Sequence, residues 1–345
     1  MNTGVVKKRT IFPGVCAVDR VGRKGWFILA LWVSALSAPV QAEWYRQTDA
    51  IMGTEVAVEF WADDRVLADR VIDQIFADMR RIDALWNPDN PDSELAMINR
   101  DAVKRAVPIS PETAALLGKA LYYSALSDGA FDVSYASVGY LYNYREHRHP
   151  SDQSIADARP GIDYTAIKLD EKALTVRLMK PGMHLDFGGI AKGYSVDRGI
   201  AALRDAGIAA GLVSAGGDSR ILGDRGDRPW SIGIRHPRKE GEFAVIIPLA
   251  NTAISTSGDY ERFFIEGGKR FHHIINPRTG RSVDELQSVS ILAPKAIDSD
   301  ALSTTVFVLG IERGLALINR LPGIDAILID GGGRLHYSSG LMQPE

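Results

Sequence analysis

The feature that most constrains the fold is a stretch near the middle of the chain, residues 184–197, with the sequence HLDFGGIAKGYSVD. Apolar residues flank Asp186, two glycines follow, and a helical pattern then runs to Gly207 with these apolar positions on one face: Ile190, Val196, Ile200 and Leu203. The pattern predicts a strand, a tight turn and a helix. The fold must therefore bring a strand end, an exposed backbone and a helix start together.

This combination would suit a phosphorylated ligand. Gly188 and Gly189 would let the backbone approach a ligand closely, and the N–H groups at the helix start would face an anion. Lys192 lies one turn into the helix, where it could reach a phosphate. A simpler interpretation is that the glycines pack the helix against a sheet and that Asp186 caps the turn. This stretch alone leaves both interpretations open.

Residues 1–42 have the pattern of a secretory signal peptide. Six lysines and arginines precede the apolar run 26–33, and Val40-Gln41-Ala42 offers small residues at the −3 and −1 positions of a cleavage site. The competing interpretation is a retained membrane anchor, but the apolar run is shorter than the roughly 20 residues that a spanning helix needs. We therefore expect a cleaved signal and a periplasmic protein, which would be membrane-associated if the leader were kept.

The leader also holds the only cysteine, Cys16, so the expected mature chain has no thiol for a disulfide, a metal site or a nucleophile. Removing residues 1–42 takes away six positive charges and one negative charge, which changes the formal charge from −3 to −8. An acidic surface of this kind repels nucleic acid. The composition therefore argues against a nucleic-acid partner and against cysteine chemistry.

Helical and strand patterns follow one another irregularly along the rest of the chain. Helices are expected after caps at Asp63, Ser93 and Ser110, and over 298–309 and 312–319. The expected strands are 52–61, 167–178 as a hairpin, 211–214, 230–235, 243–249, 253–257, 262–266, 271–275, 288–292 and 326–330. Gly267-Gly268 should form a two-residue hairpin turn. Strands in hairpin runs, without regular βαβ alternation, predict an α+β fold.

Two further segments carry residues for a cation and a phosphate. A second glycine pair, Gly216-Gly217, follows a short strand as the first pair does, so two exposed turns could face one cavity. Asp300 and Thr304 lie one helical turn apart, and hard oxygen ligands of this kind suit Mg²⁺ or Ca²⁺. The other interpretation is that Asp300 caps the helix and that Thr304 bonds back to a carbonyl. The sequence does not decide between a metal site and these local roles.

A pair of histidines offers a candidate base. On a strand, His272 and His273 point to opposite faces, so at most one of them can face a given cavity. That histidine could take a proton from an attacking hydroxyl, or it could lie at an edge in water. No Gly-x-Ser-x-Gly elbow occurs, so a serine-hydrolase triad is not supported.

Eight segments, taken in order, resemble the ApbE family of FAD:protein FMN transferases. They are 52–54, 92–95, 129–132, 186–197, 213–217, 254–258, 273–280 and 300–310. The resemblance implies a single domain over residues 43–345, with a T-fold-like α+β architecture in which mostly antiparallel sheets pack against helices. It also implies an enzyme that needs Mg²⁺, cleaves FAD, releases AMP and attaches FMN by a phosphoester bond to a threonine or serine of a target redox protein.

The resemblance further implies roles for individual residues. Asp186 and Lys192 would contact FAD, and His273 would activate the acceptor hydroxyl. Mg²⁺ would be held by three groups: the Gly189 carbonyl, the catalytic Asp300 and Thr304. The flavin site would be lined by Met52, Ala130, Phe131, Asp132 and Ile275.

Two other functions would use the same binding residues. With water in place of the acceptor hydroxyl, the protein would be a Mg²⁺-dependent FAD pyrophosphatase that yields FMN and AMP. Without any chemistry, it would be a periplasmic flavin-binding protein. For the transferase, the exported location favours a target in a membrane electron-transfer complex. The sequence alone does not separate transfer, hydrolysis and binding.

Overall fold

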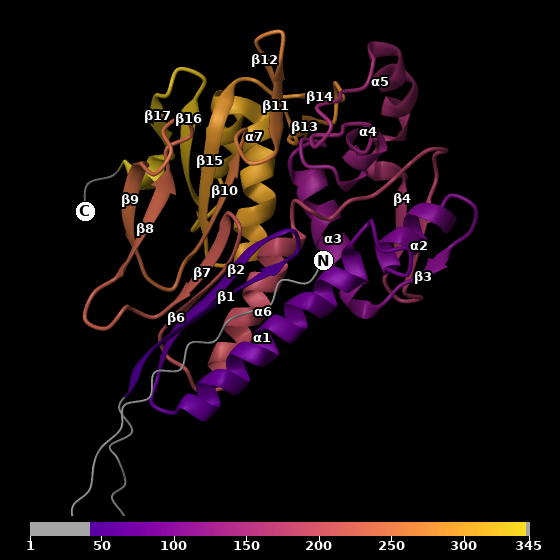
Figure 1. Cartoon of the computed structure of the whole chain (residues 1–345). Coiled ribbons are helices and arrows are strands. Elements are labelled where there is room, and N and C mark those ends of the chain that lie inside the picture. Colours follow the sequence, from indigo (N-terminus) through magenta and orange to yellow (C-terminus); the bar gives the residue numbers. More distant parts are fainter. Residues whose placement is uncertain (1–41, 343–345) are drawn as a thin grey trace, which may run out of the picture. The chain divides into compact units, whose positions relative to one another are not determined.

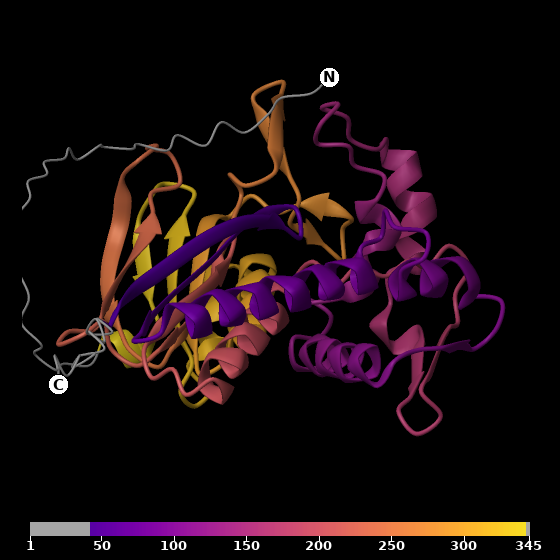
Figure 2. The same ribbon diagram turned by 60° about the horizontal axis from the view of Figure 1, so that its bottom comes forward.

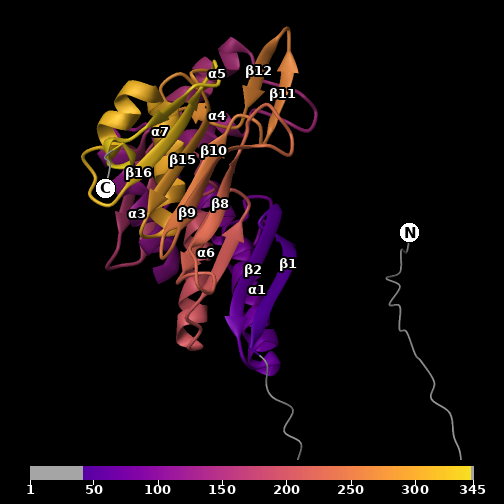
Figure 3. The ribbon, with the colours of Figure 1, turned by 90° about the vertical axis from the view of Figure 1, so that its left-hand side faces the viewer.

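The computed structural model describes residues 42–342, and its central element is an eight-stranded sheet (Figure 1). The strand order is β1-β2-β6-β7-β10-β15-β16-β17, and every neighbouring pair is antiparallel. The bounds are β1 Glu43–Ile51, β2 Thr54–Ala62, β6 Gly211–Ala215, β7 Asp218–Leu222, β10 Ala253–Gly258, β15 Leu286–Ala293, β16 Asp325–Asp330 and β17 Leu335–Tyr337. Figure 3 shows β1 and β2 at one edge of this sheet. The predicted α+β class, with mostly antiparallel sheets and packed helices, is confirmed.

Three long helices cover one face of the sheet: α1 Arg65–Trp86, α6 Ala191–Asp205 and α7 Ala296–Ile318. A hairpin of β8 Trp230–Arg235 and β9 Phe243–Leu249 covers the other face. Alternation along β10 divides the two layers, because Ser255 bonds to Ser299 of α7 at 2.7 Å while Ile254 packs with Trp230 of the hairpin. Figure 2 shows α1 running from beneath the sheet toward the remaining helices.

Those remaining elements form a second region beside the sheet. Its helices are α2 Glu94–Asp101, α3 Pro111–Leu126, α4 Ala136–Gly139 and α5 Asp152–Ala158, with short 3-10 turns at Val133–Tyr135, Arg159–Gly161 and Tyr164–Ala166. Its small sheet contains β3 Val107–Pro108, β4 Ile167–Asp170 and β5 Thr175–Leu178. Two further hairpins pair β11 Phe263–Glu266 with β12 Lys269–His272, and β13 Ile275–Asn276 with β14 Arg281–Ser282. A last 3-10 turn covers Ser339–Leu341.

Most local predictions are confirmed. Ser110 caps α3 with its side chain, and Pro111 opens that helix. Gly267 and Gly268 both have positive φ, 56° and 77°, as a two-residue turn requires. The predicted break between two late helices lies at Gly310, where φ is 79° inside the long α7.

Two local predictions are wrong. The cap of α1 is Asp64, whose side chain accepts from two backbone N–H groups, and not Asp63. The residues before the Gly188–Gly189 turn do not form a strand. Instead, the side-chain amide of Asn99 accepts from the N–H of Leu185 at 2.7 Å and donates to its carbonyl at 2.9 Å. A side chain 86 positions away thus satisfies the backbone where a neighbouring strand was expected.

Helix α7 forms much of the core between the sheet and the second region. Among residues 42–342 it is the one helix with the length and apolar character to cross a membrane, but most of it is buried in the fold. Core helices of globular proteins pass the same test. The resemblance to a membrane span therefore reflects its place in the core.

The contact between α6 and α7 depends on a glycine. A Cβ at Gly193 would lie 2.2 Å from the carbonyl oxygen of Ala296 and 2.7 Å from Cβ of Asp300. We expect Gly193→Ala to lower the free energy of unfolding by about 3 kcal/mol, because the clash is with backbone that cannot rotate away. Chemical denaturation measures this change. The exposed Ala201→Gly on the same helix is the control, with an expected loss of about 1 kcal/mol from helix propensity alone; equal losses would contradict the packing argument.

Candidate functional site

Lys192 is the centre of a cluster of charges from three elements. Its Nζ lies 2.7 Å from Oδ2 of Asp218 and 3.6 Å from Oδ1 of Asp300. Asp218 opens β7 directly after the Gly216–Gly217 turn, so the second glycine pair does reach the same place as the first. The turn was apparent from the sequence, but Asp218 was not identified there as a site residue.

The two carboxylates of this cluster are almost fully buried, each 3% exposed. Oδ2 of Asp300 accepts from the N–H of Gly193 at 2.8 Å, so a carboxylate of the protein itself takes the anion position at the start of α6. Burial and the charge of Asp218 raise the pKa of Asp300 to about 7, against the opposing effect of Lys192. Burial lowers the pKa of Lys192, but Asp218 and Asp300 outweigh it and leave that pKa raised. When both acids are ionised, the cluster has one negative charge more than the lysine balances. This excess favours the binding of an additional cation.

The local roles considered for Asp300 and Thr304 are not observed. Helix α7 begins at Ala296, and Asp197 accepts from its first N–H groups at 2.8 and 3.0 Å, so Asp300 lies within the helix and does not cap it. The hydroxyl of Thr304 makes no bond to a carbonyl within residues 42–342, and its one neighbour in hydrogen-bonding range is Ser257, at 3.4 Å. Both side chains are therefore available to the cluster.

Oxygen atoms surround this part of α7. Oγ of Ser257 lies 2.8 Å from Oγ of Ser303. A Cβ placed on Gly189 would lie 3.5 Å from Oγ1 of Thr304, so the glycine backbone runs beside that hydroxyl. No group of three or more His, Cys, Asp or Glu side chains in the described part of the chain could hold a metal. A metal here would therefore rely on fewer than three such side chains together with hydroxyl and carbonyl oxygens, a hard donor set that fits Mg²⁺ when substrate oxygens complete it.

One of the predicted flavin-lining residues packs directly against Gly189. Phe131 is buried, and its ring lies 3.2 Å from the position that a Cβ on Gly189 would occupy. Ala130 precedes it and is also buried. Asp132 accepts from Ser134 and from the backbone N–H of Tyr164, so its carboxylate fixes the loop that carries Phe131. Burial raises the pKa of Asp132.

Met52, another predicted flavin-lining residue, lies at the edge of the main sheet. It lies in the β1–β2 turn with a positive φ of 55° and packs against the two largest apolar clusters. Positive φ is uncommon for a residue with a side chain. The turn thus holds Met52 in a strained conformation between the sheet and the second region.

Asp186 lies among tyrosines that carried no signal in the sequence. Its Oδ1 accepts from the N–H of Gly188 at 2.6 Å, which closes the turn as the simpler interpretation proposed. Its Oδ2 lies 3.3 Å from the hydroxyl of Tyr140. Burial and the charge of Asp186 raise the pKa of Tyr135, which packs in the same apolar cluster as Ile275. Asp186 therefore closes its own turn with one oxygen and lies beside a tyrosine hydroxyl with the other.

The two histidines have different roles in the structure. His272 is buried, and its Nε2 lies 2.5 Å from the carbonyl of Val283 while Nδ1 accepts from the N–H of Ile274. A carbonyl only accepts, so His272 is neutral with its proton on Nε2 and serves the fold. Nδ1 of His273 is buried and has no hydrogen-bond partner within the described residues. His273 is the histidine that remains available for chemistry.

Both histidines should make stability depend on pH. Burial, together with the charge of Arg262, lowers the pKa of His273 well below its ordinary value, and burial also lowers that of His272. The unfolded chain binds a proton near pH 6.5 that the folded chain does not. We therefore expect the melting temperature to fall between pH 7 and pH 5, and to fall less in His273→Asn. An equal fall in the variant would show that His273 is protonated in the fold.

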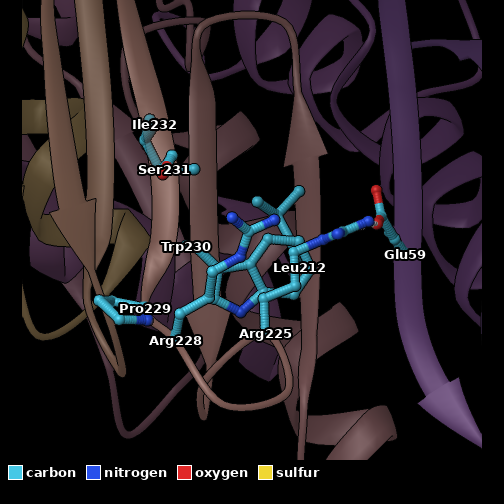
Figure 4. Close-up of a pocket in the computed structure, with 8 residues that line it drawn as sticks. All are labelled: Glu59, Leu212, Arg225, Arg228, Pro229, Trp230, Ser231 and Ile232. Atoms are coloured by element: carbon cyan, nitrogen blue, oxygen red, sulfur yellow. Dashed lines mark hydrogen bonds and ion pairs between the residues drawn. The ribbon is translucent and has the colours of Figure 1, made fainter.

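One cavity within residues 42–342 lies away from these residues. It has a volume of about 350 Å³, and Figure 4 shows its lining of Glu59, Leu212, Arg225, Arg228, Pro229, Trp230, Ser231 and Ile232. None of the predicted site residues lines it. A smaller cavity of about 120 Å³ reaches the Gly216–Gly217 turn beside Asp218. The site is therefore defined by its side-chain chemistry and not by cavity size.

The described residues thus combine an antiparallel α+β fold with a buried Asp–Lys–Asp cluster, nearby hydroxyl oxygens and a histidine whose Nδ1 has no partner among them, a set of groups that suits a cation and a phosphate. The chain belongs to the ApbE family, whose model matches residues 52–328. It is 32% identical to an FAD:protein FMN transferase of Treponema pallidum over 86% of this chain and 88% of the relative. For an FAD:protein FMN transferase of Klebsiella pneumoniae the identity is 32%, over 83% and 89%.

Solved structures agree with this family. The ApbE protein of Thermotoga maritima has a TM-score of 0.80 and 33% identity, over 87% of this chain and 98% of that protein. The flavinyl transferase ApbE of Pseudomonas stutzeri has a TM-score of 0.78 and 28% identity, over 87% and 96%. The resemblance found in the sequence and the expected ApbE architecture are both confirmed.

Proposed function

We propose that this protein is a Mg²⁺-dependent FAD:protein FMN transferase. The chain is a transferase of the ApbE family, and its relatives carry that name. The observation that carries the proposal is the presence of both a buried carboxylate cluster and a neutral histidine whose Nδ1 has no partner within the described residues. In the reaction, the acceptor hydroxyl oxygen attacks the phosphorus of the FMN half of FAD. The new O–P bond forms as the bond to the bridging oxygen breaks, AMP leaves with that oxygen, and the hydroxyl proton passes to the base.

Three groups of this chain would hold Mg²⁺: Asp300, Thr304 and the carbonyl of Gly189. When bound, the ion would neutralise charge on the diphosphate oxygens. Asp186 and Lys192 would contact FAD. The flavin would lie against the loop and turn residues around Gly189 and the tyrosine cluster, namely Met52, Ala130, Phe131, Asp132 and Ile275.

His273 would act as the base. A base must be unprotonated before the reaction, and the lowered pKa keeps this imidazole neutral at physiological pH. Its buried Nδ1 lacks a partner within the described residues, so this nitrogen is free to take the proton. His273 would orient the acceptor hydroxyl and receive its proton as the O–P bond forms.

The proposal is tested with the mature protein, FAD, Mg²⁺ and a candidate redox subunit. We expect flavin that survives denaturation on the subunit, an equal amount of free AMP, and loss of the label when the acceptor threonine or serine is replaced by alanine. AMP and FMN without labelled protein would favour the pyrophosphatase. Tight binding of FAD without either product would favour the flavin carrier.

We also propose that the protein is exported and acts in the periplasm, on a subunit of a membrane electron-transfer complex. The basis is the leader pattern of residues 1–42, of which all but the last residue lie outside the described residues. Cell fractionation and N-terminal sequencing test this proposal. A mature chain that begins near residue 43 in the periplasmic fraction is expected; an uncleaved cytoplasmic chain would contradict it.

A further inference from the structure

Lys192 does not supply a free positive charge for a phosphate. Its ammonium lies 2.7 Å from Asp218 and 3.6 Å from Asp300, so two carboxylates already balance it. A diphosphate that bound to Lys192 alone would have to compete with both acids. A second cation near the cluster, without a carboxylate partner, would be better suited to an anionic substrate.

Arg262 has the required position. It directly precedes β11, and the pairing of Phe263 with His272 places Arg262 opposite His273 in the same antiparallel register. The N–H of His273 donates to the carbonyl of Arg262 at 3.1 Å, which confirms that pairing. Side chains of directly opposed residues point to the same face of a hairpin and lie within about 5.5 Å at Cβ. The guanidinium therefore projects on the same side as the candidate base.

The charge of Arg262 acts on groups from several elements around the site. It lowers the pKa of His273, after the larger effect of burial, and it opposes protonation of Lys192 at the start of α6. It also opposes the burial that raises the pKa of Tyr135, beside Asp186. The charge of Arg262 therefore reaches His273, Lys192 and Tyr135.

Arg262 also has no ion pair or side-chain hydrogen bond within residues 42–342, unlike the other arginines near this hairpin. Arg235 lies 2.5 Å from Glu261, and Arg270 lies 3.6 Å from Asp259. An exposed guanidinium that is left unpaired beside a catalytic histidine is prepared for an anion, and its planar fork matches phosphate oxygens.

We propose that Arg262 binds the phosphate of the FMN half of FAD and holds its phosphorus next to His273. The inference rests on the proposed function, because it assumes that a flavin phosphate enters this site. The guanidinium would donate to the non-bridging oxygens of the phosphate that receives the acceptor hydroxyl. It would place charge on those oxygens while Lys192 remains bound to its two acids.

The test compares FMN with riboflavin, which differ by the phosphate alone. Binding of each is followed by flavin fluorescence in the wild-type protein and in Arg262→Gln. We expect the wild-type protein to bind FMN more tightly than riboflavin. In Arg262→Gln, FMN affinity should fall about tenfold or more, and riboflavin affinity should change less than about twofold. Arg262→Lys keeps the positive charge without the planar guanidinium, so its FMN affinity should lie between those of the wild-type protein and Arg262→Gln. This variant replaces Arg262→Gln in the test if the glutamine variant does not fold.

Arg235→Gln is the matched control, since it removes an exposed, paired arginine from the neighbouring hairpin. It should leave both affinities unchanged. Equal losses for FMN and riboflavin, or no loss for either, would overturn the proposal, as would a wild-type protein that does not distinguish the two flavins. The affinity ratio needs no turnover, so a protein that shows the expected ratio but never labels an acceptor would refute the proposed function and leave the role of Arg262 standing.

Discussion

Asp300→Asn is expected to slow FMN transfer by about a thousandfold while leaving the protein folded. Asparagine removes the negative charge that a divalent cation needs. It keeps a side-chain oxygen that can accept from the N–H of Gly193, which lies 2.8 Å from the Asp300 carboxylate in the wild-type protein. Burial and the charge of Asp218 raise the pKa of Asp300 and so disfavour its ionised form, and we expect that losing the charge will not lower the melting temperature. Rates of AMP release and acceptor labelling, with a thermal melt, measure both effects.

Asp298→Asn is the control for this prediction. Asp298 lies on the same helix, but its carboxylate bonds to Tyr123 at 2.6 Å and lies 2.9 Å from Lys119, away from the cluster. Its replacement should change transfer by less than about threefold. Wild-type activity of Asp300→Asn with the metal chelated would defeat the assignment of the cation site.

His273→Asn is expected to reduce the rate of transfer at saturating FAD by about a hundredfold to ten-thousandfold. Asparagine can still orient a hydroxyl but cannot take its proton. FAD affinity should stay within a factor of about three, because the base acts on the acceptor and not on the flavin. Stopped-flow transfer rates and flavin fluorescence separate the two quantities.

His272→Asn provides the contrast. It removes a buried bond to the carbonyl of Val283 and should lower the melting temperature, whereas His273→Asn should not lower it at neutral pH. The reverse result, in which His272→Asn stops transfer and His273→Asn only lowers the melting temperature, would contradict this assignment. It would show that the site lies on the other face of this strand.

The sequence predicted what depends on neighbouring residues. The cap and proline that open α3, the glycine turn of β11–β12 and the break at Gly310 each follow from side-chain chemistry within a few positions. The spacing of Asp300 and Thr304 on one helix face was visible for the same reason. The order of eight short segments along the chain is enough to indicate the ApbE family.

The sequence did not show what depends on contacts between distant segments. Asp218 faces Lys192 only because β7 begins beside the start of α6, so the lysine appeared free when it is bound to two acids. The strand expected at Leu185 is absent because Asn99 satisfies its backbone from another helix. Arg262 became notable only when the register placed it opposite His273. The sequence around Arg262 contains no feature that marks this arginine as a site residue.

The most direct test of the account is a crystal structure of His273→Asn with FAD and Mn²⁺, with the metal located by its anomalous scattering. We predict one metal at about 2.1 Å from the carboxylate of Asp300, beside Thr304 and in contact with the diphosphate, with the isoalloxazine against Phe131. A bound FAD whose diphosphate lies away from Asp300, or a metal held by other residues, would contradict the account.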